Sequence, residues 1–150
     1  VQTCALPISG SLILCSYHLL KDGERKKYDV VGKVLAVKEL EKNEAGTLKA
    51  INSLQGGFLQ DDLYVFVVDL NTGHYVAHGT NLRLLNTDFS KVKDPDGKPV
   101  GAPILKLMAE QDQGEYQYRW KNPVTGKVEN KHAYVRKAGH FMVAVGYYSP

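Results

Sequence analysis

The sequence has little of several features that would assign it to a common class of protein. Its two cysteines, Cys4 and Cys15, are 11 positions apart, too few and too close to staple a chain of 150 residues. No apolar run approaches the roughly 20 residues that a bilayer-spanning helix needs. Neither sign of charge dominates, with 19 basic and 16 acidic residues, which argues against a dedicated nucleic-acid binder. The length instead fits one domain with its own hydrophobic core.

The start of the chain differs in character from the rest. Residues 1–8, which read VQTCALPI, resemble the translation of a common sequencing adapter. The apolar stretch 11–16 that follows is consistent with the tail of a truncated signal peptide or with the start of a helix. We therefore expect residues 1–20 to be a non-native or truncated leader, and residues 21–150 to form a single domain.

Hydrophobic periodicity predicts a helical region followed by strands. Residues 21–55 carry an apolar stripe at helical spacing, and the pair Gly56 and Gly57 ends it. The period then changes to that of strands over residues 63–69, 75–78, 115–120, 130–136 and 141–148. Hairpin turns join most of these strands, and only the connection 79–112 is long, with a short helix from Pro103. This pattern predicts an α+β fold, with a long N-terminal helix packed on a five-stranded antiparallel sheet.

No motif in the sequence predicts catalysis, a metal or a cofactor. There is no Gly-x-Ser-x-Gly elbow, phosphate loop or dinucleotide fingerprint. His74 and His78 would share one face of a strand but lie roughly 13 Å apart, too far to share a metal ion. Residues 94–97 read as a turn rather than a calcium loop, because Pro103 stands where such a loop needs a glutamate. We expect a protein that is not an enzyme.

The aromatic composition points instead to binding. Nine tyrosines stand against four phenylalanines and one tryptophan, so most aromatic rings carry a hydroxyl. Hydroxyls, an imidazole, an indole and an ammonium on adjacent strands can surround a small anion, while the rings cover its carbon end. Alternatively, these rings only fill the core with their polar tips at water. The candidate groups are Tyr64, His78, Tyr118, Trp120, Lys131 and Tyr134.

Residues from about 47 to 148 resemble the single Cache domain of the second type, an extracytoplasmic sensory domain related in fold to PAS domains. No one of the matching stretches is specific by itself, but their order and spacing together are. They are residues 62–69 (DLYVFVVD), 76–78 (VAH), 93–98 (KDPDGK), Gly114, 118–123 (YRWKNP), 125–127 (TGK), Lys131, 134–135 (YV) and 145–148 (VGYY).

The resemblance implies a role as well as a fold. Such domains belong to bacterial chemoreceptors and sensor kinases, or occur as small exported proteins. Many bind short organic acids such as acetate, propionate, pyruvate or lactate without changing them, in a pocket between the sheet and the long connection. The resemblance thus implies a periplasmic or extracellular location, and membrane attachment only through parts outside this chain. A second copy of the chain, bound through the N-terminal helix, is a further candidate partner.

Matched one position at a time, the resemblance assigns roles to the six candidates. Lys131 would be the charge partner of the acid, Tyr118, Tyr134 and His78 would hydrogen-bond it, and Trp120 and Tyr64 would be walls. Three positions depart from the family pattern: Gly79 replaces a proline, Asn86 a glycine and Glu115 a tryptophan. The rival prediction is a structural or interaction module whose pocket is filled by its own side chains.

Overall fold

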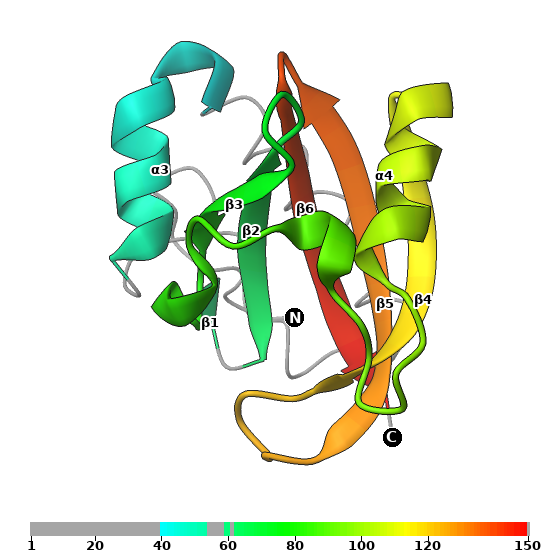
Figure 1. Cartoon of the computed structure of the whole chain (residues 1–150). Coiled ribbons are helices and arrows are strands. Elements are labelled where there is room, and N and C mark those ends of the chain that lie inside the picture. The colour runs from blue at the N-terminus through cyan, green and yellow to red at the C-terminus, as the bar shows by residue number, and fades with distance from the viewer. Residues whose placement is uncertain (1–39, 54–58, 61, 150) are drawn as a thin grey trace, which may run out of the picture.

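The fold is an antiparallel sheet with helical segments on both faces (Figure 1), seen in a computed structural model that describes residues 40–53, 59–60 and 62–149. The sheet order is β1-β2-β6-β5-β4, and β3 also pairs with β2. The five predicted strands are confirmed, and a two-residue strand, β1, was not predicted. Their bounds are β1 Leu59–Gln60, β2 Leu63–Asp69, β3 His74–His78, β4 Gln113–Lys121, β5 Val128–Ala138 and β6 Phe141–Ser149.

The predicted long N-terminal helix is not found as one piece. Its residues 21–39 and 54–55 lie outside the described residues, and the described part holds the helix α3 (Glu44–Asn52). A break at Asn43 separates α3 from the helical residues 40–42. The Asn43 side chain accepts a hydrogen bond from the Gly46 backbone N–H at 3.1 Å, so it caps α3. Asparagine is among the best N-caps because its side-chain oxygen satisfies an orphan helix donor.

Two hydrophobic clusters lie on opposite faces of the sheet. One contains Ile51 of α3 together with Val65, Val67 and Val143 of the sheet. The other contains Ile104 and Met108 of α4 (Gly101–Glu110), together with Phe66 and Val68 of β2. Strand β2 is thus buried on both sides, which explains its uninterrupted apolar run.

The long connection covers the same face as α4. In Figure 1 it runs from β3 across the sheet to α4, through the 3₁₀ turns η2 (Leu82–Leu84) and η3 (Phe89–Lys91). Phe89 and Val100 anchor it in the cluster beneath. Asn86 has φ 64°, in the left-handed region that glycine adopts freely and that asparagine tolerates best among other residues. This φ angle explains how asparagine fits at a position where the resemblance leads us to expect glycine.

A β-bulge in β3 decides which way His78 points. Val68 pairs with Tyr75 and Val67 with Ala77, so Val76 is an extra residue. Directly paired residues share a face, so Tyr75 and His78 both lie on the face of Val68 and Phe66. His74 pairs with Asp69 on the other face. The expectation that His74 and His78 share a face is therefore wrong, because the bulge reverses the alternation between them.

Candidate functional site

The site is built on a row of facing residues in the middle of the sheet. Lys131 on β5 pairs with Tyr118 on β4 and with Tyr148 on β6. In the next row on the same face of the sheet, Ala133 pairs with Gly146, and Gly146 also pairs with Tyr64 of β2. These two small residues leave room over the sheet for the long Lys131 side chain. A Cβ added at Gly146 would come within 3.0 Å of Lys131 Cε, which shows that the side chain crosses this glycine.

The Lys131 amino group lies deep among aromatic rings. The residue is 1% exposed, and its Nζ donates a hydrogen bond of 2.8 Å to the Tyr64 hydroxyl. The same nitrogen lies 4.1 Å from the centroid of the Tyr64 ring and 5.3 Å from the centroids of Phe66 and Tyr148. A cation over aromatic faces is attracted by their quadrupoles. The fold therefore presents one ammonium group at the base of an aromatic pocket.

His78 presents a second donor to the same pocket. Its Nδ1 accepts hydrogen bonds from the backbone N–H groups of Thr80, at 3.1 Å, and Asn81, at 3.0 Å. An Nδ1 that accepts carries no proton, so the ring is neutral with its proton on Nε2. Burial, reinforced by the Lys131 charge, lowers the pKa of His78 to about 3. Among the described residues the structure shows no hydrogen-bond acceptor for Nε2–H, although His78 is only 3% exposed.

Backbone contacts fix His78 from the opposite side of the sheet. The Asn52 side chain at the end of α3 accepts from the His78 N–H at 2.9 Å and donates to the Val76 carbonyl at 3.2 Å. These two bonds span the bulge and hold the end of β3 against α3. The orientation of the imidazole is thus set by groups on both sides of the strand.

Aromatic and aliphatic side chains close the remaining walls. The sheet supplies Phe66, Tyr118 and Trp120, and the connection supplies Phe89, Val92 and Val100. Together with Tyr64, Tyr75, His78 and Lys131 they line a cavity of about 10 Å³, which has room for about one water molecule. Burial raises the pKa values of Tyr64 and Tyr118 well above the ordinary range, so both hydroxyls stay protonated.

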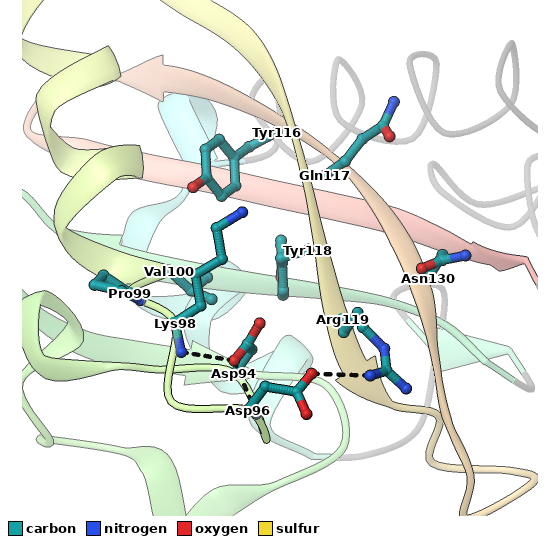
Figure 2. Close-up of a pocket in the computed structure, with 10 residues that line it drawn as sticks. All are labelled: Asp94, Asp96, Lys98, Pro99, Val100, Tyr116, Gln117, Tyr118, Arg119 and Asn130. Carbon is teal, nitrogen blue, oxygen red and sulfur yellow. Dashed lines mark hydrogen bonds and ion pairs between the residues drawn. The ribbon is translucent and has the colours of Figure 1, made fainter.

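Two larger hollows flank this cavity. One, of about 310 Å³, shares Tyr64, His78 and Trp120 with it and extends over Thr80, Asn81 and Pro123. The other, also about 310 Å³, shares Tyr118 and Val100 with it (Figure 2). Figure 2 shows Tyr116 and Tyr118 on the side of β4 that faces the connection, and an ion pair between Arg119 and Asp96. The Arg119 and Asp96 side chains are 2.8 Å apart. Trp120 thus lines both the small cavity and the first hollow, and Tyr118 lines both the small cavity and the second.

Five of the six residues expected from the sequence lie around this cavity, and Tyr134 does not. Tyr134 belongs to the cluster on the other face of the sheet, with Val145 and Tyr147. It is three positions from Lys131, and side chains an odd number of positions apart point to opposite faces of a strand. Sequence reasoning also missed Tyr148, whose hydroxyl lies 2.9 Å from that of Tyr64. The strand register that places Tyr148 beside Lys131 is the signal that identifies it.

Comparison with known proteins places the chain in a family. The family model described as Single Cache domain 2 matches residues 33–149. The chain belongs to the Single Cache domain 2 family. The resemblance noted in the sequence is therefore confirmed, and the sheet has the arrangement of solved Cache domains.

Solved structures and curated proteins similar to this Cache domain are sensory proteins. A structure described as the basis for carboxylic acid recognition by a Cache chemosensory domain is 25% identical, with a TM-score of 0.61 over 94% of this chain and 86% of that one. A periplasmic sensor domain of a chemotaxis protein has a TM-score of 0.69 at 23% identity, over 85% of this chain and 97% of that one.

Two curated proteins are also similar. The methyl-accepting chemotaxis protein McpP of Pseudomonas putida is 29% identical over 62% of this chain, and the sensor histidine kinase MctS of Rhizobium johnstonii is 30% identical over 58%. The match spans only 17% and 19% of their lengths, respectively. Within the described part of this Cache domain, no helix is long and apolar enough to cross a membrane, and no three His, Cys, Asp or Glu residues form a metal-binding group.

Proposed function

We propose that this Cache domain is a non-catalytic sensory domain that binds a short organic acid of the acetate, propionate, pyruvate or lactate type. The observation that carries the proposal is the convergence of two buried donors, Lys131 Nζ and His78 Nε2–H, on one aromatic cavity. A carboxylate has two oxygens and can accept from both. In this proposal the pocket binds the acid without changing it.

Burial makes this pair of donors selective for a carboxylate. A buried N–H without an acceptor costs roughly 1–3 kcal/mol, which a bound oxygen would recover at His78. The Lys131 ammonium would add a charge-assisted hydrogen bond, which is about twice as strong as a neutral one. The rings of Phe66, Tyr118 and Trp120 can cover only a small carbon skeleton. The chemistry therefore favours acids of two to four carbons.

Binding must enlarge the cavity, since about 10 Å³ holds one water and no acid. Trp120 lines both the cavity and a hollow of about 310 Å³, and it lies on β4, at one end of the sheet order. We propose that a shift of Trp120 joins the two spaces and that the acid selects this open arrangement. Such a population shift at the sheet is the proposed signal, and the Asn52 contacts link it to α3.

A thermal-shift screen of the four acids tests the proposal. A ligand at 100 times its Kd stabilises the folded state by about 2.7 kcal/mol. For a domain of this size we expect that to raise Tm by about 5–10 °C. The absence of any shift with all four acids, in folded protein, would refute the proposed function.

The variant Lys131→Met tests the assigned charge partner. Loss of the charged hydrogen bond should weaken acid binding by about 10- to 150-fold, measured by calorimetry. The matched control is Lys137→Met, which removes a partly exposed lysine from the other end of β5 and should leave Kd unchanged. An unchanged affinity for the acid in Lys131→Met would show that Lys131 is not its charge partner.

A second candidate function is a structural or interaction module. The small volume of the cavity favours it, because side chains already fill most of the space between Trp120 and the connection. The same screen decides between the two candidates, since a module of this kind gives no shift with any acid.

Location and partners are proposed from the relatives. Because one similar solved structure is described as the periplasmic sensor domain of a chemotaxis protein, we propose a periplasmic or extracellular position for the domain, which we place within residues 21–150. A homodimer through the N-terminal helical region remains a prediction of the sequence.

A further inference from the structure

Tyr148 lies beside the proposed site without lining its cavity, and its hydroxyl belongs to a chain of hydrogen bonds. Lys131 Nζ is 2.8 Å from the Tyr64 hydroxyl, and the Tyr64 hydroxyl is 2.9 Å from the Tyr148 hydroxyl. The Tyr148 hydroxyl in turn lies 3.3 Å from the backbone carbonyl oxygen of Lys121. These contacts join β5, β2, β6 and the end of β4 across the floor of the pocket.

The chemistry of the two ends fixes the direction of every bond. A carbonyl oxygen only accepts, so Tyr148 gives its single proton to Lys121. Tyr148 can then only accept from Tyr64, which gives up its single proton in turn. Burial keeps the pKa of Tyr148 above the ordinary range, so its hydroxyl remains a donor. The Tyr64 oxygen is left as an acceptor, and Lys131 donates to it.

We propose that Tyr148 is a positioning residue that acts through Tyr64 to hold the Lys131 ammonium in the orientation that receives a carboxylate. This inference rests on the proposed function. Tyr148 holds the proton of Tyr64 away from Lys131, so the lone pair of Tyr64 faces the ammonium. Without Tyr148 the Tyr64 hydroxyl proton loses its acceptor, and the Tyr64 lone pair is no longer held in the direction of the ammonium.

The directions of these hydrogen bonds also determine which groups can donate to a bound acid. Because its proton is committed to Tyr148, Tyr64 offers no donor to the acid. Lys131 and His78 remain as donors, beside the Tyr118 hydroxyl and the Trp120 indole that also line the cavity. Tyr64 is left as a wall and as a support for Lys131.

The test uses Tyr148→Phe in the full chain, with Tyr147→Phe as the matched control. Tyr147 is the neighbouring tyrosine of β6, also buried, but on the opposite face of the sheet, where it stacks on His132. The first readout needs no ligand: the ¹H–¹⁵N resonance of the Lys131 ammonium, assigned by its loss in Lys131→Met. We expect Tyr148→Phe to shift or broaden this resonance and Tyr147→Phe to leave it in place.

The second readout is the Kd for propionate in a double-mutant cycle with Tyr64→Phe. We expect Tyr148→Phe to weaken binding about 2- to 12-fold, the worth of one hydrogen bond. In the Tyr64→Phe background, Tyr148→Phe should weaken binding no further. A residue that only packs against the pocket would give the same loss in both backgrounds.

The outcomes separate the two proposals. An unchanged Lys131 resonance in Tyr148→Phe, or equal losses of affinity in both backgrounds, would overturn the positioning role. If the wild-type chain binds neither propionate nor the other three acids while the resonance still shifts in Tyr148→Phe, the positioning of Lys131 stands and the proposed function fails.

Discussion

The neutral state of buried His78 makes a quantitative prediction about stability and pH. Its pKa is about 3 in the folded chain, against an ordinary value of 6.5 that we take for the unfolded chain. The folded state therefore disfavours the protonated ring. The resulting stability is fully present above pH 6.5 and is lost as pH falls from 6.5 towards 3. Two pKa values this far apart give a slope of about 1.4 kcal/mol per pH unit within that window.

The variant His78→Asn isolates this effect. Asparagine does not titrate, and its side-chain oxygen can accept from a backbone N–H two residues later, as His78 Nδ1 does from Thr80. Between pH 7.5 and 5.0 we expect the wild-type chain to lose about 2 kcal/mol more unfolding free energy than the variant. The smaller side chain also lowers stability, but equally at every pH. The other ionisable groups are common to both proteins, so their contributions cancel in the difference.

Urea unfolding at a series of pH values measures the difference. Trp120 is the only tryptophan of the chain and lines the pocket, so its fluorescence reports unfolding. Parallel pH profiles for the two proteins would refute the reasoning, because they would mean that His78 has the same pKa in the folded and unfolded chains. A titration of the His78 ring by NMR gives an independent check, since the Nε2–H tautomer should persist at pH 5.

Two further predictions concern the geometry of the sheet. Tyr134→Phe should change the Kd for any bound acid by less than about twofold, because Tyr134 lies on the face away from the pocket. A tenfold loss of affinity, measured by calorimetry, would show that Tyr134 contributes to the binding site. Gly146→Ala should both destabilise the fold and weaken acid binding, because the new Cβ would lie 2.5 Å from the His132 carbonyl oxygen and 3.0 Å from Lys131 Cε. Overpacking at this position should lower the free energy of unfolding by about 1–3 kcal/mol. An unchanged urea unfolding curve would contradict this, because it would mean that strands β5 and β6 accommodate the new methyl group without loss of stability.

Much of the site follows from local pattern. The alternation along β4 puts Tyr116, Tyr118 and Trp120 on one face and Glu115 on the other, as expected from the sequence, and the structure leaves Glu115 exposed. The assignment of Tyr134 to the pocket came from its hydroxyl-bearing ring on an adjacent strand and from the family resemblance. It conflicts with the same alternation, because Lys131 and Tyr134 are an odd number of residues apart.

The sequence by itself determined the strands, most of the turns and the choice of an antiparallel sheet. These depend on side-chain period and turn chemistry, which act over a few neighbouring residues. Tertiary structure decided the face of His78, through the bulge at Val76, and the place of Tyr148 beside Lys131. Both depend on strand register, which is set by pairing between segments far apart in the chain. A shift of one residue in that pairing moves every side chain to the other face.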